Sequence, residues 1–221
     1  MTHLNIAIDG PAGAGKSTAA KGLAARLGIR YLDTGAMYRA MAVACARAGI
    51  DTLDEGKVQK QLERSEITVR FSDEGQRVFL NGEDVTGMLR TPEISMGASN
   101  VSRHPAVRDK LVELQRRTAS EYDVVMDGRD ITTNVLPDCP NKFFVTASPE
   151  ERARRRLLEL QRKGDTEETY ETVLRDIRER DHNDSTRAYM PLRIAEDAVV
   201  VDTTGMTPEE VLDFMEARIQ R

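Results

Sequence analysis

Residues 10–17 are the stretch of this chain whose types and spacing point most clearly to chemistry. They read Gly-Pro-Ala-Gly-Ala-Gly-Lys-Ser and fit the phosphate-loop pattern G-x-x-x-x-G-K-[ST]. Glycines let the backbone wrap closely around anionic oxygens, with its N–H groups pointing inward. In such a loop Lys16 reaches the β- and γ-phosphates of a nucleotide, and Ser17 ligates Mg²⁺. We therefore expect nucleotide binding by Gly10, Pro11, Ala12, Gly13, Ala14, Gly15, Lys16, Ser17 and Thr18.

The segments on either side of this loop strengthen the interpretation. Residues 4–8 are apolar except for Asn5 and predict a short buried strand, and Gly28 marks the end of a helix that begins at Lys16. The helix is indicated by apolar residues at helical spacing, which are Ala19, Ala20, Leu23, Ala24 and Leu27. A strand, a loop and a helix in this order place a phosphate at a helix N-terminus. The alternative is a purely structural strand-to-helix turn, which this context disfavours.

A second candidate site follows another apolar strand. Asp127-Gly128-Arg129-Asp130 comes at the carboxyl end of residues 122–127, where open α/β sheets bind ligands. Asp127 can hold Mg²⁺ directly or through water, and Arg129 and Asp130 can bind a second ligand. Residues 33–39, which follow the short apolar run 29–32, predict a similar strand-end loop. A polar strand end followed by a glycine turn is the structural alternative for the first of these sites.

Arginines form a third group. Arg180, Asp184 and Arg187 are spaced i, i+4 and i+7, so they share one helical face if a helix extends that far. The other clustered arginines are Arg152, Arg154, Arg155, Arg156, Arg175 and Arg178. Arginine binds phosphate in planar, bidentate geometry. For the cluster as a whole we favour a second phosphate-binding element over a solvated face, although any single arginine can equally be a surface ion-pair partner.

The remaining elements predict an α/β fold. Residues 122–127, 142–147 and 198–202 are apolar without alternation, which is typical of parallel strands buried on both faces. Capping boxes at residues 148–151 and 207–210 predict helix starts, the first helix running toward Arg162. Alternating strands and helices indicate a parallel sheet.

One region between about residues 50 and 91 breaks this pattern. Residues 67–71 and 77–80 alternate apolar and polar side chains around a turn at 72–76, and Asn81-Gly82 offers a second turn. We expect a small antiparallel sheet inserted into the α/β core.

Composition excludes several classes of protein. The chain has 221 residues, 31% charged and 39% hydrophobic, and a net charge of −5, which argues against a general nucleic-acid binder. It shows no signal-peptide pattern and no apolar run of membrane-spanning length. The only cysteines, Cys45 and Cys139, lack metal spacing, so reduced thiols and a cytoplasmic location are expected. His3, His104 and His182 are scattered, which gives little support to a zinc site or a histidine-based triad.

Taken together, these residues resemble the bacterial cytidylate (CMP) kinases, nucleoside monophosphate kinases of the P-loop superfamily, over nearly the whole chain. Beyond the loop, the resemblance rests on residues 8–11, 33–39, 82–86, 90–94, 127–131, 180–181, 184–187, 191–192 and 197–204. It implies one kinase domain over residues 1–221, a P-loop three-layer sandwich with a central parallel sheet. Residues 1–36, 99–150 and 186–221 would form the core. Residues 37–98 would form a monophosphate-binding insert with the small antiparallel sheet, and residues 151–185 a helical lid.

The resemblance also implies roles for individual residues. Arg39, Arg129 and Arg187 would bind the acceptor phosphate, and Ser99, Arg108 and Asp130 the cytosine base. The sugar hydroxyls would be held by Arg180 and Asp184, and Thr34 would supply a hydroxyl to the acceptor site. Lys16, Arg129 and the lid arginines Arg154 and Arg155 would be catalytic, and Ser17 and Asp127 would hold the metal. Thr132 stands where this family usually has glycine, and threonine is costly there if the backbone needs a positive φ.

The implied activity is ATP- and Mg²⁺-dependent phosphorylation of CMP and dCMP in pyrimidine nucleotide metabolism, by a monomer with no nucleic-acid or membrane partner. A kinase for another small acceptor, such as UMP, AMP or shikimate, is the alternative enzyme. A GTPase-like switch would need an N/T-K-x-D motif after a strand, whereas Asn141-Lys142-Phe143-Phe144 lacks the aspartate and precedes its strand. An RNA-binding module is disfavoured by the negative charge and by the lack of an aromatic-rich stacking motif.

Overall fold

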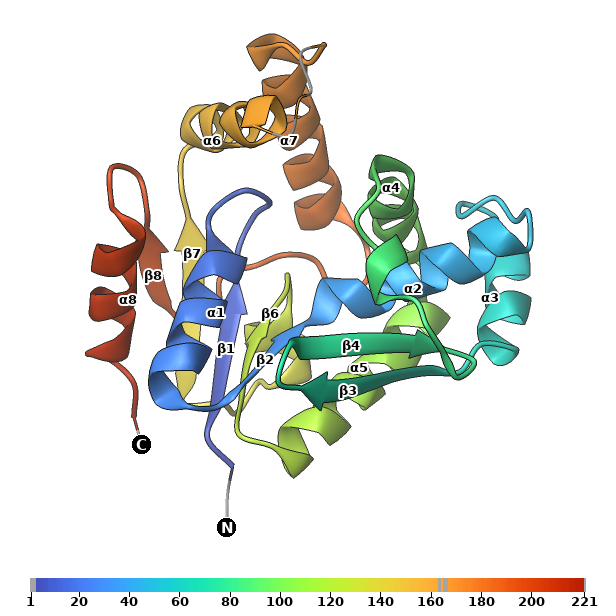
Figure 1. Cartoon of the computed structure of the whole chain (residues 1–221), viewed down its shortest axis with the longest axis horizontal. Coiled ribbons are helices and arrows are strands. Elements are labelled where there is room, and N and C mark those ends of the chain that lie inside the picture. The colour runs from blue at the N-terminus through green and yellow to red at the C-terminus, as the bar shows by residue number, and fades with distance from the viewer. Residues whose placement is uncertain (1–2, 163, 165–166, 221) are drawn as a thin grey trace. The chain divides into compact units, whose positions relative to one another are not determined.

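The computed structural model describes residues 3–162, 164 and 167–220 (Figure 1). The chain divides into two compact units, and each is described on its own below. The first unit comprises Met1–Leu4 and Ile29–Val124, and the second comprises Asn5–Gly28 and Val125–Arg221.

The second unit contains a parallel sheet in which the strands follow the order β6-β1-β7-β8. Their bounds are β1 Asn5–Asp9, β6 Val124–Asp127, β7 Asn141–Thr146 and β8 Val199–Asp202. Strand β1 pairs in parallel with β7, with Ile8 opposite Phe143, and β7 pairs in parallel with β8. The three strands β6, β1 and β7 are almost wholly buried, as their uniform apolar sequences predict. The prediction is wrong for β8, an outer strand of this sheet, where Val200 is exposed.

The helices of the second unit begin and end at recognisable caps. Helix α1 ends at Gly28 with φ 66°, as predicted, and the Thr207–Glu210 capping box starts the last helix. The other predicted box forms only in part, because the Ser148 amide donates to Thr204. The elements are α1 Lys16–Leu27, the π-helical turn η2 Ile131–Val135, α6 Pro149–Arg162, α7 Tyr170–Thr186 and α8 Pro208–Glu216.

Helix α8 packs closely against α1. A Cβ atom placed on Gly22 would lie only 2.6 Å from a methyl group of Leu212, so glycine allows this close approach. In the last turn of α1, Arg26 forms ion pairs with three acidic residues of α8, which are Glu209, Asp213 and Glu216. This packing and these ion pairs hold the C-terminal helix on the phosphate-loop helix.

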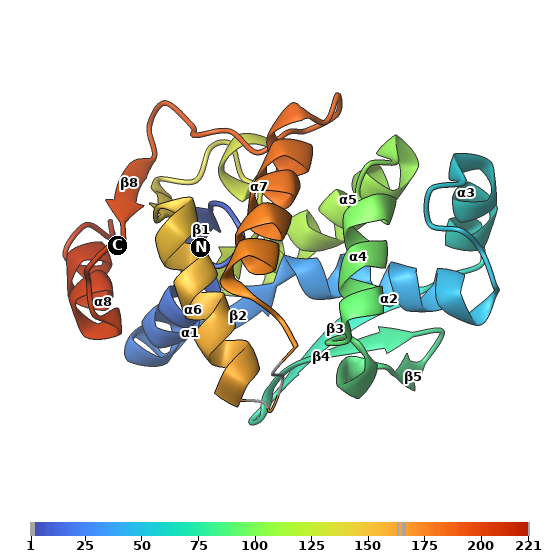
Figure 2. The same cartoon turned by 90° about the horizontal axis from the view of Figure 1, so that it is seen from above.

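Helices α6 and α7 lie side by side in both views (Figures 1 and 2). They share a small apolar core of Ala153, Val173 and Ile177, against which Leu157, Leu160, Tyr170 and Leu174 pack. The buried guanidinium of Arg152 on α6 pairs with the carboxylate of Asp181 on α7. The two helices span the residues 151–185 for which a lid is predicted, and residues 163, 165 and 166 of that range lie outside the described ones. Helix α7 ends one residue before Arg187, which is its C-cap, so the expected helical face is cut short there.

The first unit carries the predicted antiparallel sheet. Strands β3 (Ile67–Ser72) and β4 (Gly75–Leu80) form a hairpin, and β5 (Glu83–Asp84) follows the predicted turn at Asn81-Gly82. Asn81 and Gly82 both have positive φ values, of 51° and 82°. The α/β class with a parallel sheet and a separate small antiparallel sheet is therefore confirmed.

The other elements of the first unit are mainly helices. They are β2 Arg30–Asp33, α2 Thr34–Arg47, α3 Glu55–Glu63, the 3₁₀ turn η1 Thr86–Met88, α4 Pro92–Val101 and α5 Pro105–Glu121. The expected loop at residues 33–39 is wrong, because β2 leads directly into α2. The Asp33 carboxylate caps that helix by accepting a hydrogen bond from the Ala36 amide.

Candidate functional site

The phosphate loop joins β1 to α1 in the second unit, as the sequence predicts. Its backbone depends on glycine at both ends. A Cβ on Gly10 would lie 1.9 Å from the carbonyl oxygen of Val145 on β7, and φ there is +143°. Gly15, with φ 90°, is the N-cap of α1. The loop therefore opens onto the N-terminus of a twelve-residue helix, where backbone N–H groups and the helix dipole favour an anion.

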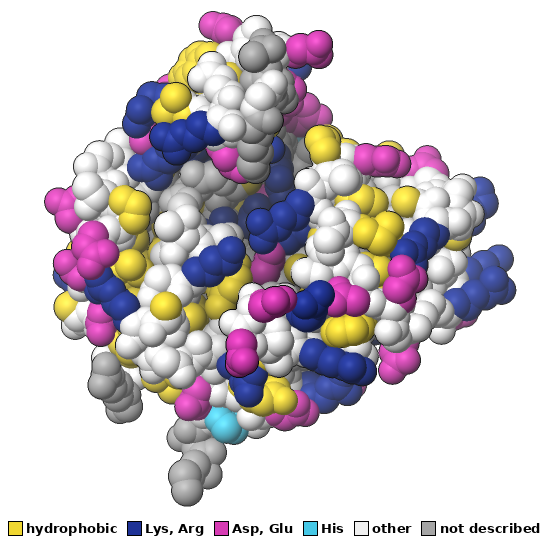
Figure 3. All heavy atoms as spheres, in the orientation of Figure 1, with side chains coloured by type: hydrophobic (Ala, Val, Ile, Leu, Met, Phe, Trp, Pro, Cys, Tyr) yellow, Lys and Arg dark blue, Asp and Glu magenta, His cyan; other side chains and the backbone are white. Residues whose placement is uncertain are grey.

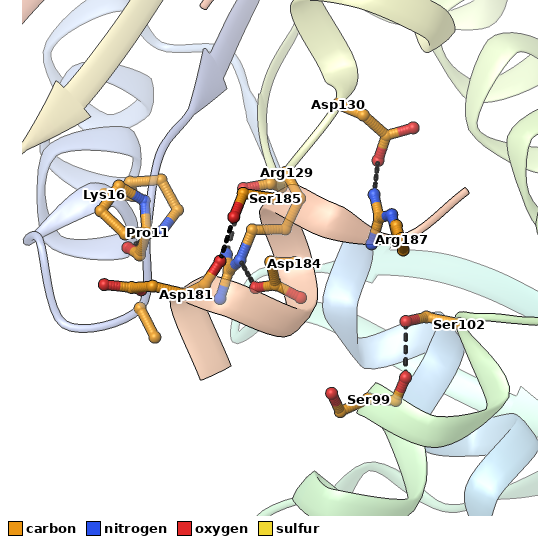
Figure 4. A network of polar contacts seen from close by, with 12 residues as sticks. Pro11, Lys16, Ser99, Ser102, Arg129, Asp130, Asp181, Asp184, Ser185 and Arg187 are labelled. Carbon is orange, nitrogen blue, oxygen red and sulfur yellow. Dashed lines mark hydrogen bonds and ion pairs between the residues drawn. The ribbon is translucent and has the colours of Figure 1, made fainter. Parts of the chain in front are cut away.

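Lys16 is held inside this loop. Its Nζ donates to the carbonyl oxygen of Pro11 at 2.7 Å, and its side chain is buried (Figure 4). Burial lowers the pKa of Lys16 well below its usual value. The nearby cations Arg129 and Arg180 add to this effect, while Asp127 and Asp184 oppose it. The buried Lys16 and the half-buried Arg129 and Arg180 repel one another, and an anionic ligand would relieve this repulsion.

Ser17 and Asp127 form the candidate metal site. The Ser17 hydroxyl on α1 donates to Oδ2 of Asp127, at the end of β6, at 2.6 Å. Mg²⁺ prefers oxygen ligands and is usually held by one or two protein groups together with phosphates and water. This pair of oxygens beside a phosphate loop fits that requirement. Among the described residues no group of three histidine, cysteine or acidic side chains forms a metal cluster.

The predicted acceptor residues of the second unit lie together (Figure 4). Arg129 Nε donates to Oδ2 of Asp184 at 2.8 Å, and Nη2 of Arg187 pairs with Oδ1 of Asp130 at 3.3 Å. Burial by itself would raise the pKa of Asp184. The charges of Arg129, Arg180 and Arg187 outweigh it and hold that pKa below its usual range. The carboxylate is therefore ionised amid three arginines, and this arrangement can bind an anion and nearby hydroxyl groups.

The clustered arginines of α6 have different surroundings. Arg155 donates to the hydroxyl and carbonyl oxygens of Thr203, and its Nη1 lies 3.9 Å from a Cβ placed on Gly15. Arg154 has 62% of its side chain exposed and pairs with Glu151. Arg156 pairs with Glu159, and Arg152 is buried. Arg155 is thus the predicted lid arginine that lies beside the phosphate loop, while Arg154 extends toward solvent.

The remaining predicted residues belong to the first unit. Arg108 is 1% exposed, donates to the carbonyl oxygen of Ser102 at 3.3 Å and lies over the ring of Tyr38. In the same turn the Ser102 hydroxyl donates to the Ser99 carbonyl (Figure 4). Arg39 forms an ion pair with Asp33, and Thr34 is buried at the first turn of α2. Ser99 and Arg108 are therefore both hydrogen-bonded to Ser102, and their common role in binding the base stays a prediction.

Two residues that contact the site segments were given no individual role from the sequence. Asp9, the last residue of β1, is fully buried and accepts hydrogen bonds from residues 131 and 132. Arg152 donates to the carbonyl oxygen of Ala12 in the phosphate loop as well as pairing with Asp181. An acid directly before the loop and an arginine in a dense cluster were visible in the sequence. Their partners, 123 and 140 residues away, were not.

Acidic and basic side chains are interspersed over the face of the molecule drawn in Figure 3. None of the helices in the described residues has the length and apolar character needed to cross a membrane.

With this geometry in place, comparison with known proteins identifies the family. The family model described as cytidylate kinase matches residues 6–221. The chain belongs to the cytidylate kinase family. It is 50% identical to a cytidylate kinase of Caldicellulosiruptor bescii over 212 residues, which are 96% of this chain and 93% of that one. It is 53% identical to a cytidylate kinase of Desulfitobacterium hafniense over 211 residues, 96% of this chain and 90% of that one.

Among solved structures, a protein from Thermus thermophilus aligns over the full length of both chains with 22% identity and a TM-score of 0.47. As a member of the cytidylate kinase family, the chain is a nucleoside monophosphate kinase, a phosphotransferase.

Proposed function

We propose that this protein transfers the γ-phosphoryl group of ATP to CMP and dCMP, giving CDP or dCDP and ADP. The observation that carries the proposal is membership of the cytidylate kinase family over residues 6–221. The phosphate loop, the Ser17–Asp127 pair and the cluster of Arg129, Asp184 and Arg187 supply groups suited to this chemistry.

The phosphate group of CMP is anionic at neutral pH, so its oxygen can act as the nucleophile without losing a proton. An oxygen of the CMP phosphate forms the new P–O bond while the bond between the γ-phosphorus and the β,γ-bridging oxygen breaks, so no general base is needed. Catalysis then depends on positioning and on neutralising charge. Lys16 and the backbone N–H groups of the loop would bind the donor phosphates, and Arg129, Arg155 and Arg154 would balance charge on the transferred group. Closure of α6 and α7 as a lid would exclude water and suppress hydrolysis.

A magnesium ion held by Ser17 and Asp127 would supply a Lewis acid for the phosphate oxygens. The Ser17 hydroxyl offers a lone pair in addition to the proton it donates to Asp127. Asp127 would bind directly or through water.

On the acceptor side, we assign the phosphate of CMP to Arg39, Arg129 and Arg187, and the sugar hydroxyls to Arg180 and Asp184. Thr34 would contribute a hydroxyl. Cytosine would be bound by Ser99, Arg108 and Asp130, since its amino group matches a carboxylate and its ring acceptors match an arginine. Uracil presents a carbonyl where cytosine has the amino group, and this carbonyl lacks the donor that a carboxylate oxygen of Asp130 needs.

We further propose that the enzyme works as a monomer in the cytoplasm. Two buried cysteines with free thiols fit a reducing compartment and support the proposed location.

The test is an ADP-release assay with ATP across a panel of acceptors. CMP and dCMP should give the highest kcat/KM, with UMP, AMP and shikimate at least about tenfold lower, the difference expected for one or two polar base contacts. Lys16→Met is the control without transfer, because it removes the cation at the donor phosphates. Higher activity on UMP, AMP or shikimate would overturn the proposed acceptor. Strong ATP hydrolysis without any acceptor preference would overturn the kinase proposal itself.

A further inference from the structure

Asp9 has an unusual set of partners for a strand-end acid. Its Oδ1 accepts the Ile131 amide at 2.8 Å, and its Oδ2 accepts both the amide and the hydroxyl of Thr132, at 2.7 and 2.6 Å. The side chains of Asp9, Ile131 and Thr132 are all buried. A buried carboxylate is costly unless its oxygens are hydrogen-bonded in this way, so the contact is a built feature of the fold.

This contact joins two segments that carry the chemistry. Gly10, the first residue of the phosphate loop, directly follows Asp9, and Arg129 and Asp130 directly precede Ile131. The Gly128 amide also donates to the carbonyl of Ile8 at 2.9 Å, so the turn is attached to the end of β1 at both of its sides. Asp130 is the N-cap of the π-helical turn. Its carbonyl accepts the Asn134 amide at 2.9 Å and the Val135 amide at 3.2 Å, and the second of these is the i→i+5 bond of a π-helix.

We infer that Thr132 is a positioning residue for phosphoryl transfer. Its hydroxyl, through Asp9, fixes the turn that carries Arg129 and Asp130 to the start of the phosphate loop. This inference rests on the proposed function, because it concerns acceptor groups of that reaction. Thr132 acts through Asp9 and is not assigned a contact with substrate.

The hydroxyl is the part of this contact that depends on residue type. Any residue other than proline at 131 and 132 supplies the two amides, but only threonine or serine adds the third donor. An O–H···O⁻ bond of 2.6 Å is a short, charge-assisted contact. Among the described residues only Asn81 and Met190 combine a side chain with a positive φ. Threonine is therefore unstrained at position 132, and the cost expected from its replacing glycine does not arise.

The contact also gives Asp9 a distinctive titration. The pKa of Asp9 is raised to about 6, mainly because of burial and also because of the charge of Asp130, although the Thr132 hydroxyl and the two amides oppose this shift. The charge of Arg129 also interacts with Asp9. Removing the hydroxyl removes a group that favours the carboxylate, so Asp9 should take up a proton at a higher pH.

The experiment compares Thr132→Val, which replaces the hydroxyl by a methyl group, with Thr132→Ser, which keeps it. For Thr132→Val we expect a fall in kcat/KM for CMP of roughly 5- to 30-fold, with the KM for ATP changed less than about twofold. The acid limb of the kcat–pH profile should move to higher pH. Thr132→Ser should lie within about twofold of the wild type on each measure. Thr133→Val is the matched control, because the Thr133 hydroxyl accepts from Asn134 rather than contacting Asp9.

Melting temperatures show whether each variant folds, and Thr132→Ala, which adds no methyl group, replaces the valine variant if that one does not. A valine or alanine variant with a lower Tm but wild-type kcat/KM and an unmoved acid limb would overturn the inference and leave Thr132 a structural residue. If the wild type prefers another acceptor, the proposed function fails on its own. The same comparison with that acceptor then decides the role of Thr132.

Discussion

Two neighbouring strands, β1 and β6, both end in a buried aspartate, and the two carboxylates differ in what surrounds them. Asp9 faces two backbone amides and a threonine hydroxyl, all from one turn of the chain. Asp127 faces the hydroxyl of Ser17, a residue of the phosphate loop. The residue type and the position at the strand end are the same, so the surrounding donors determine the role. Asp9 holds the protein framework, whereas Asp127 is the acid that we propose as a metal ligand.

The largest expected effect comes from the ligand-facing acid. Asp127→Asn should lower kcat by about 100-fold or more, because the proposed metal ligand loses its charge while the volume is kept. The apparent affinity for Mg²⁺ should fall with it, and the Tm should change by less than about 3 °C. Activity is measured over a magnesium titration, alongside thermal unfolding. A large loss of Tm with unchanged magnesium dependence would place Asp127 with Asp9 as a framework residue.

The opposite result is expected for the framework acid. Asp9→Asn puts an amide group in front of three donors, so at least one buried donor loses its acceptor, at a cost of about 1–3 kcal/mol. Chemical unfolding should show this loss, with a fall in Tm of roughly 2–8 °C. Asp202→Asn is the matched control. Asp202 also ends a strand, but it is exposed and accepts the Thr204 amide, so the cost there should be about 1 kcal/mol or less. If the two substitutions lower the free energy of unfolding equally, Asp9 is not a framework residue in the sense proposed.

A third acid sharpens the comparison, because Asp130 lies on the turn that Asp9 holds. Asp130→Asn should narrow the preference for CMP over UMP by about 1–3 kcal/mol, as expected for one polar contact with a base. The change exchanges an acceptor-only carboxylate for an amide that can donate to the uracil carbonyl. The measurement is kcat/KM for both acceptors at saturating ATP. If both substrates are slowed alike, Asp130 supports the site without recognising the base.

The smallest expected effect is a pH dependence specific to Asp9. Its folded pKa of about 6 lies above the ordinary 3.8, so the folded protein binds the proton more tightly than the unfolded chain. The associated stability is complete below the ordinary pKa and is lost as the pH rises through 6. The free energy of unfolding of the wild type should therefore exceed that of Asp9→Asn by about 1 kcal/mol more at pH 5 than at pH 7.5. Unfolding at the two pH values measures this, and a constant difference would contradict the raised pKa.

Local signals made much of the fold predictable. The phosphate loop, the stop at Gly28, the Thr207 capping box and the hairpin turn at Asn81 each depend on residues within a few positions of one another. Where local prediction failed, a distant group competed. The capping box at Ser148 lacks its second hydrogen bond, because the Ser148 amide donates to the Thr204 hydroxyl instead of to Glu151. The Glu151 carboxylate pairs with Arg154 and Arg155.

The candidate site was predictable by residue type but not by partner. Ser17 and Asp127 were both predicted to hold metal, and the structure brings their oxygens together. The attachment of Asp9 to Thr132 and of Arg152 to Ala12 joins segments more than a hundred residues apart, and no periodicity or spacing encodes such a pairing. The same limit applies to the choice between Arg154 and Arg155, which depends on the position of Thr203.

The close approach of α1 to α8 should restrict the substitutions that evolution accepts at positions 22 and 212. A side chain larger than hydrogen at position 22 would meet the methyl groups of Leu212, so the Leu212 side chain would have to turn away or be replaced by a shorter one. The two positions are therefore expected to change together. A lineage that acquires alanine at 22 should also carry a shorter side chain at 212, and in a pairwise mutational library each of these changes should be tolerated better with the other than alone.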